Sequence, residues 1–134
     1  MRVALDTNVL ASAIGTRGLC TDVMRLVLLG HELVVGERVL QELRRNLTKK
    51  FRLPAALVNE TDALLRAEAI VSTHADVVDI VALDTADARV LSEAVAAKAD
   101  VFVTGDLELQ ELGERAPLSI LSPRQFWERV HRGD

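Results

Sequence analysis

A chain of 134 residues suffices for one domain, and its formal net charge of −4 comes from 16 Lys and Arg against 20 Asp and Glu. This balance excludes a protein that coats nucleic acid through overall positive charge. No apolar run approaches the roughly 18 residues that a membrane span requires. Residues 1–10 are too short and too acidic for a signal peptide, and the single cysteine excludes an intrachain disulfide. We therefore expect one cytoplasmic domain over residues 1–134.

The first ten residues predict a buried strand that leads through a polar turn into a helix. Residues 2–5 form a short apolar run, and apolar residues then recur at helical spacing over residues 9–14. Between them stand Asp6, Thr7 and Asn8, at the carboxyl end of the strand, where open parallel sheets bind ligands. Taken alone, Asp6 or Thr7 is equally well explained as a helix N-cap.

The rest of the chain alternates between helical and strand patterns. Helices are expected over residues 19–29, 37–50, 55–69, 85–98, 107–112 and 123–132, and strands over residues 33–35, 70–71, 101–103 and 120–121. Helix 55–69 is expected to pack through Leu57, Leu64 and Leu65, and residues 76–83 are interpreted as a loop. The alternation predicts a parallel sheet with helices on both faces.

Four acidic residues are placed where they can meet at one edge of this sheet. Asp6 and Asp106 each follow a strand, Asp87 shares the apolar side of its helix, and Glu42 flanks the apolar stripe of helix 37–50. A carboxylate on an apolar side needs compensation, and clustered carboxylates repel one another, so convergence calls for Mg²⁺ or Mn²⁺. Such an ion activates a bound water for attack on a phosphodiester. Spacing alone leaves the convergence open, and for Glu42 an exposed helix glutamate is the alternative.

Basic residues gather on and just after helix 37–50, namely Arg44, Arg45, Lys49, Lys50 and Arg52. They are candidate contacts for an RNA backbone, and a solvated helix face is the competing interpretation. Arg17, in the first loop, is a further candidate.

Three stretches of the chain match motifs of a known family. They are LDTNVLASA at Leu5–Ala13, VLQELRRNL at Val39–Leu47, and DTADARVLSEAVAAKADVFVTGD at Asp84–Asp106. On these motifs the chain resembles PIN-domain ribonucleases, specifically the small prokaryotic ones regarded as toxin components of toxin–antitoxin pairs. The resemblance covers nearly the whole chain. It implies a single PIN domain with a three-layer α/β/α fold, whose parallel five-stranded sheet has the order 3-2-1-4-5.

The resemblance also implies a site and an activity. The implied metal ligands and catalytic residues are Asp6, Glu42, Asp87 and Asp106, and the residues that orient them are Thr7, Asn8 and Thr104. The implied activity is cleavage of single-stranded RNA with Mg²⁺ or Mn²⁺ as cofactor. Two protein partners stay open, a cognate antitoxin and a second copy of the chain.

Two other functions compete with this one. A catalytically inactive PIN module that binds RNA or a protein partner does not need all four acids, yet all four are present. A phosphotransferase of the haloacid-dehalogenase type needs a second Asp two residues after the first, where this chain has Asn8. The chain departs from the family pattern where Thr85 and Ala86 separate Asp84 from Asp87, so a role of Asp84 beyond capping stays open.

Overall fold

The strands form from short apolar and β-branched runs, which suit a sheet that is buried on both faces. In the computed structural model, which describes residues 1–73 and 85–133, they are β1 (Arg2–Leu5), β2 (Glu32–Gly36), β3 (Ile70–Ser72), β4 (Val101–Val103) and β5 (Ser119–Leu121). All neighbouring strands are parallel, in the order β3-β2-β1-β4-β5. The strand order implied by the family resemblance is therefore confirmed, and it makes β1 and β4 direct neighbours.

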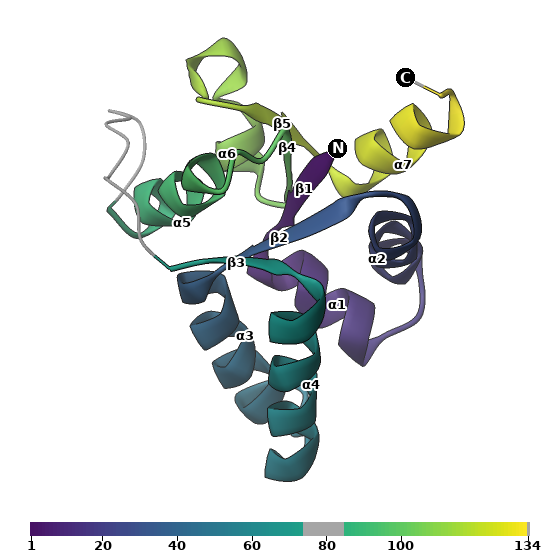
Figure 1. Ribbon diagram of the computed structural model, residues 1–134, viewed down its shortest axis with the longest axis vertical. Coiled ribbons are helices and arrows are strands. Elements are labelled where there is room, and N and C mark those ends of the chain that lie inside the picture. Colours follow the sequence, from purple (N-terminus) through teal and green to yellow (C-terminus); the bar gives the residue numbers. More distant parts are fainter. Residues whose placement is uncertain (74–84, 134) are drawn as a thin grey trace.

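Helices connect the strands and cover both faces of the sheet (Figure 1). They are α1 (Thr7–Gly15), α2 (Leu19–Gly30), α3 (Glu37–Lys49), α4 (Ala55–Glu68), α5 (Thr85–Ala96), α6 (Leu107–Gln110) and α7 (Pro123–His131), with a 3-10 turn at Gly113–Arg115. Ser122 begins α7 through a capping box with Gln125. In the described part of the chain, no helix combines the length and the apolar character needed to cross a membrane.

The sheet separates two apolar cores, because successive residues of a strand point to opposite faces. Val3 and Leu5 of β1 belong to the larger core, which also contains buried residues of α1, α2, α3, α4 and α7. Ala4 faces the smaller core, together with Phe102 of β4 and Leu91 of α5. The helix α5 is thereby packed on the opposite face of the sheet from α1.

The structure contradicts one prediction, and two others concern residues that it does not describe. The prediction that α4 packs through Leu57 and Leu64 is wrong, since these side chains are 43% and 60% exposed. The buried residues are Val58 and Leu65, seven apart, because α4 packs along one narrow stripe that leaves its other faces in solvent. The loop predicted at residues 76–83 and the predicted cap Asp84 lie outside the described residues.

Candidate active site

Asp6 and Asp106 lie at the carboxyl edge of the sheet, directly after the end of β1 and shortly after the end of its neighbour β4. The backbone N–H of Asp6 continues the β-ladder and donates to the carbonyl oxygen of Val103 at 3.0 Å. Both acids are helix N-caps. Oδ1 of Asp6 accepts from the Thr7 N–H at 2.8 Å, and Oδ1 of Asp106 accepts from the Glu108 N–H at 2.9 Å. Capping therefore accounts for one oxygen of each carboxylate and leaves the other for further contacts.

Thr104 joins these two acids. Its hydroxyl donates to Oδ2 of Asp6 at 2.7 Å and accepts from the backbone N–H of Asp106 at 3.0 Å. The residue is fully buried, and its carbonyl oxygen accepts from the side-chain amide of Gln110 at 2.8 Å. Its own N–H donates to the carbonyl oxygen of Leu121 in β5 at 3.0 Å. Thr104 is thus held rigidly, and it orients the carboxylate of Asp6.

Glu42 reaches the same edge of the sheet from α3. The hydroxyl of Thr7 donates to Oε2 of Glu42 at 3.1 Å. Thr7 is 2% exposed, whereas Glu42 is exposed, so the carboxylate meets the turn after β1 while staying open to solvent. A merely solvated helix glutamate would not need a contact with a buried hydroxyl of another helix. The structure therefore brings Glu42 to the turn that contains Asp6.

The electrostatics of Asp6 reflect its burial and its neighbours. Burial raises the pKa of Asp6 above its ordinary value, while the hydrogen bonds from Thr104 and from the Thr7 amide lower it. The negative charges of Glu42 and Asp106 raise the pKa of Asp6 further. These three carboxylates are thus close enough to interact, although desolvation affects the pKa of Asp6 more than their repulsion does.

Asp87 is half-buried in the first turn of α5, and the contacts among Asp6, Glu42 and Asp106 described above do not include it. Within residues 1–73 and 85–133, no three His, Cys, Asp or Glu side chains lie close enough together to hold one metal ion. The donor chemistry still fits Mg²⁺ or Mn²⁺, because Mg²⁺ is commonly held by one or two carboxylates and keeps several waters. The convergence of all four acids around one ion remains a prediction.

The other predicted residues differ in their surroundings. Asn8 is exposed on α1, and its side chain makes no hydrogen bond within the described residues. Among the predicted RNA contacts, the exposed residues are Arg17, Arg45, Lys49, Lys50 and Arg52. They are therefore available to a ligand in solution, which leaves their predicted contact with RNA open.

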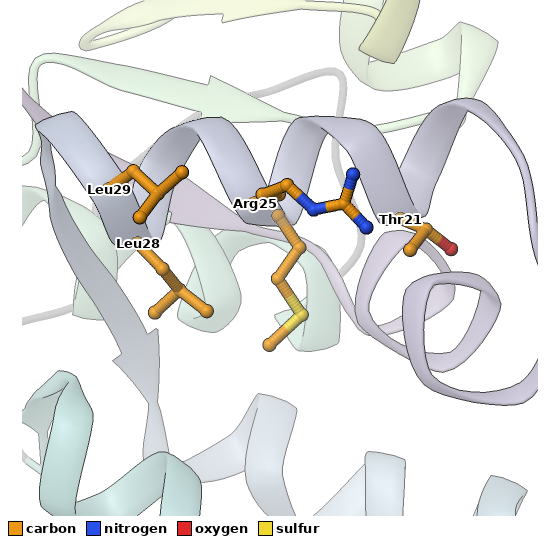
Figure 2. A pocket seen from close by; sticks show the side chains of 5 residues that line it. Thr21, Arg25, Leu28 and Leu29 are labelled. Carbon is orange, nitrogen blue, oxygen red and sulfur yellow. The ribbon is translucent and has the colours of Figure 1, made fainter.

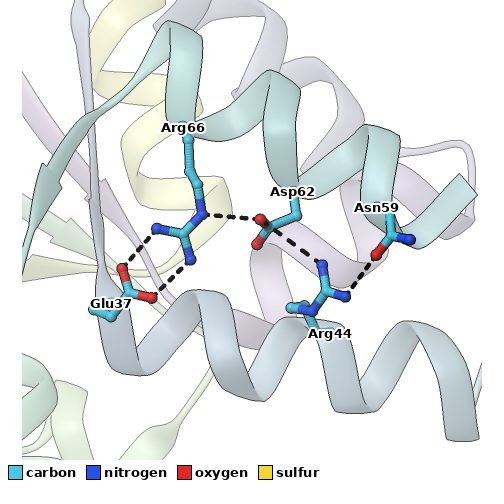
Figure 3. A network of polar contacts seen from close by, with 5 residues as sticks. All are labelled: Glu37, Arg44, Asn59, Asp62 and Arg66. Carbon is cyan, nitrogen blue, oxygen red and sulfur yellow. Dashed lines mark hydrogen bonds and ion pairs between the residues drawn. The ribbon is translucent and has the colours of Figure 1, made fainter. Parts of the chain in front are cut away.

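Arg44 differs from these residues because it belongs to a polar network between α3 and α4 (Figure 3). Its guanidinium donates to Oδ1 of Asn59 at 2.7 Å and lies 3.7 Å from a carboxylate oxygen of Asp62. Arg66 completes the network, with hydrogen bonds to Glu37 at 2.7 and 2.8 Å and to Asp62 at 2.8 Å. Hydrogen bonds to Glu37 and Asp62 raise the pKa of the Arg66 guanidinium. Arg44 thus already has an anionic neighbour, whereas the other predicted RNA contacts make no ion pair with a described residue.

Two polar residues near the site were not singled out by the sequence patterns. Gln110 supports Thr104 from α6, and nothing in its sequence context distinguishes it from an ordinary helix residue. Glu93 of α5 is only 5% exposed. It follows Val90 by three residues, and an acid at that spacing on an apolar helix side is the signal that would have identified it.

An apolar groove lies between α2 and α4. A hollow of about 310 Å³ is lined by Thr21, Met24, Arg25, Leu28 and Leu29 (Figure 2). A second hollow of about 230 Å³ shares Met24 and Leu28 and extends to Leu64, Leu65 and Glu68. Leu28, Leu29 and Leu64 are 46%, 81% and 60% exposed. Clustered apolar exposure of this kind is typical of a surface that binds a partner.

The strand order, the helices on both faces and the acids after β1 and β4 define the class of this protein. It is a parallel α/β protein with an acidic site at the carboxyl edge of its sheet. A family model described as the PIN domain matches residues 2–108, and the chain belongs to the PIN-domain family. PIN domains are generally nucleases. The family predicted from the three motifs is therefore confirmed.

Two solved structures are similar to this chain. VapBC2 from Rickettsia felis, bound to a DNA fragment from their promoter, is 14% identical over 91% of this chain and 98% of that chain, with a TM-score of 0.61. VapBC-1 from nontypeable Haemophilus influenzae is 16% identical over 92% of this chain and 99% of that chain, with a TM-score of 0.61. At these identities the similarity concerns the fold. A comparison with curated proteins gives no match.

Proposed function

We propose that this chain is a metal-dependent endoribonuclease that cleaves single-stranded RNA with Mg²⁺ or Mn²⁺ as cofactor. The observation that carries the proposal is the Thr104 hydroxyl, which contacts both Asp6 and Asp106 where β1 and β4 end. Glu42 joins the same turn through Thr7. A helix cap needs none of these contacts between separate elements. Membership of the PIN family supports the nuclease class.

Each site residue has a separate task in this proposal. The acids that would hold the divalent ion through their carboxylate oxygens are Asp6, Glu42, Asp87 and Asp106. When bound, the ion supplies a water of lowered pKa and neutralises charge on the phosphodiester. Thr104 and Thr7 donate to the carboxylates of Asp6 and Glu42, which fixes the direction of these oxygens. Asn8, exposed on α1, would orient the site, as the family resemblance implies.

Sequencing of RNA ends tests the proposed activity directly. The purified protein is incubated with a mixed pool of single-stranded RNA, with Mn²⁺ or with EDTA, and a single-stranded DNA pool of the same sequences serves as the substrate control. New RNA ends are expected only with Mn²⁺. Binding of the pool without any new ends would contradict the proposal and support the catalytically inactive module instead.

The direction of side chains on α3 divides the predicted RNA contacts into two groups. Arg45 and Lys49 follow Glu42 by three and seven residues, so they lie on the same side of α3 as this acid. Arg44 follows Glu42 by two residues and points to α4, where Asp62 is its neighbour. Arg45 and Lys49 are exposed and make no ion pair with any described residue. An RNA backbone entering the site along this side of α3 would therefore meet Arg45 and Lys49 rather than Arg44.

The salt dependence of RNA binding distinguishes these two groups. Arg45→Gln combined with Lys49→Gln should weaken binding of a single-stranded RNA and lower its log–log salt slope by roughly 1.4, about 0.7 for each phosphate that the protein no longer neutralises. Arg44→Gln, the matched control, should change the slope much less. The measurement is fluorescence anisotropy of a labelled RNA in EDTA, which prevents cleavage. An unchanged slope in the double variant would restore the solvated-face interpretation of Arg45 and Lys49.

We further propose a protein partner, the cognate antitoxin implied by the family resemblance, and assign it to the groove between α2 and α4. The VapBC structures share the fold of this chain, and the groove exposes leucine side chains that a partner would cover. Leu28→Asp should weaken complex formation with the proposed antitoxin at least tenfold, because a carboxylate would be buried at the contact. Its RNA cleavage should be unchanged.

Leu57→Asp on α4 is the matched control for that experiment. Leu57 is 43% exposed, close to the 46% of Leu28, and it does not line either hollow. Affinity is measured by calorimetry after co-expression and separation of the two chains. If both substitutions weaken the complex equally, or if neither weakens it, the partner binds elsewhere on the protein.

A further inference from the structure

Glu93 is an acid that the proposed mechanism does not use, and it is almost completely buried. Its side chain, on α5, is 5% exposed. A carboxylate at such a position is costly unless hydrogen bonds or charges compensate for the lost water. Burial raises the pKa of Glu93, whereas the backbone N–H and the positive charge of Arg38 lower it. The compensation for Glu93 therefore comes from the beginning of a different helix, α3.

The contact of Glu93 replaces a missing helix cap. The first amides of a helix have no partner within it and are commonly satisfied by an N-cap side chain. The N-cap of α3 is Gly36, which has no side chain to offer. Oε1 of Glu93 instead accepts from the backbone N–H of Arg38 at 3.0 Å. A carboxylate also suits the positive end of the helix dipole. Glu93 thus supplies from α5 the cap that α3 lacks.

The close approach of Gly36 to Glu93 shows that the two elements are fitted to each other. A Cβ on Gly36 would lie 2.6 Å from Oε1 and 3.0 Å from Cβ of Glu93. The φ of Gly36 is −75°, which any residue adopts, so the glycine is required for space and not for backbone conformation. The end of β2, the start of α3 and the carboxylate of Glu93 therefore form one tightly packed junction.

We propose that Glu93 is a positioning residue for the candidate active site. It holds the first turn of α3 against the end of β2. It thereby determines where Glu42, about one turn after Arg38 on α3, meets Thr7. This inference rests on the proposed function, in which Glu42 is a metal ligand. The hydrogen bond from the Thr7 hydroxyl to Glu42, at 3.1 Å, connects α3 to the turn after β1. This hydrogen bond requires α3 to begin directly after the end of β2.

The affinity for Mn²⁺ measures the effect of Glu93 on the site without any need for turnover. We expect Glu93→Ala to weaken Mn²⁺ binding by about tenfold, the lower limit of the effect that residues supporting metal ligands usually have. Glu93→Gln keeps an oxygen acceptor for the Arg38 amide and should stay within about threefold of wild type. The control is Leu112→Ala, which removes buried side-chain volume from the smaller core and lowers stability without altering a contact of α3. Calorimetry on the full chain gives all four affinities.

Unfolding equilibria in EDTA test the same inference without metal. Glu93→Ala and Thr7→Val each remove one tie of α3, so their effects on the unfolding equilibrium constant should deviate from a simple product by at least about threefold. If the effects of Glu93→Ala and Thr7→Val on the unfolding equilibrium constant simply multiply, the positioning role is overturned. Equal loss of Mn²⁺ affinity in Glu93→Ala and Leu112→Ala would overturn it as well. A wild-type chain that binds no Mn²⁺ would overturn the proposed function, and the coupling between Glu93 and Thr7 would then decide the inference by itself.

Discussion

Replacing Asp6 with Asn should reduce Mn²⁺-dependent RNA cleavage by about a thousandfold while leaving the fold intact. A divalent ion contributes several kcal/mol to the stabilisation of a phosphoryl transition state, and about 4 kcal/mol corresponds to a factor of a thousand. Asn keeps the shape of the side chain and one acceptor oxygen for the Thr7 amide, so the cap of α1 survives. What the variant loses is the negative charge that would hold the metal.

The control for this experiment is Asp22→Asn, an exposed acid of α2 whose nearest cation lies 4.0 Å away. Rates are measured on one fluorogenic RNA, and the melting temperature of each variant establishes that it is folded. Asp87→Asn should lose activity to a similar extent, because Asp87 is predicted to be the fourth ligand. If Asp6→Asn cuts RNA as fast as wild type, the assignment of the site is wrong. If only Asp87→Asn keeps full activity, the site consists of the other three acids.

The substitution Asp6→Asn should increase the stability of the metal-free protein, although it decreases RNA cleavage. The folded pKa of Asp6 is raised, first through burial and then through Glu42 and Asp106, so the native state holds the proton of Asp6 more tightly than the unfolded chain does. Stability in EDTA should therefore decrease as the pH rises from about 4, the unfolded value, through the folded pKa. The raised pKa of Glu93 adds to this decrease.

We accordingly expect Asp6→Asn to be more stable than wild type in EDTA at pH 7.5. The gain should be on the order of 1 kcal/mol, since removal of the buried charge is partly offset by weaker hydrogen bonds to Thr104 and Thr7. For a domain of this size that corresponds to a rise of roughly 3 to 6 °C in melting temperature. Added Mn²⁺ should narrow or invert the gap, because it binds the folded site of the wild type and not the unfolded chain.

Thermal unfolding followed by circular dichroism, over a pH series and with or without Mn²⁺, checks this expectation. Asp22→Asn should leave both the pH dependence and the Mn²⁺ response of the wild type unchanged. If Asp6→Asn melts below wild type in EDTA and wild type gains nothing from Mn²⁺, then Asp6 is only the N-cap of α1. In that case the site would lose its central ligand, and the nuclease proposal would depend on the family alone.

Sequence patterns were sufficient for the features of this protein that depend on neighbouring residues. The strand that ends at Leu5, the helix that follows it and the acid between them are local signals, and the structure contains all three. The cap of α7 by Ser122 is local in the same way. Local patterns do not show which strands pair, however, and the order of the sheet was implied only by resemblance to the PIN family.

Contacts between distant residues required the tertiary structure. Thr104 and Asp6 are 98 residues apart in the chain, and Thr7 and Glu42 are 35 apart, so no local period relates either pair. The cap that Glu93 provides for α3 crosses 55 residues. Such residues come together because the parallel sheet places the carboxyl ends of its strands at one edge.

Side-chain direction was the other property that only the folded protein decided. In the sequence, Arg44 and Arg45 belong to one basic cluster, and composition treats them alike. On α3 adjacent residues point about 100° apart, so Arg44 meets Asp62 of α4 while Arg45 points to solvent. The same cause exposes Leu64 and buries Leu65 on α4. Whether a charged or apolar residue is free to bind a ligand thus depends on which neighbouring helix its side chain faces, and that is a property of the packed structure.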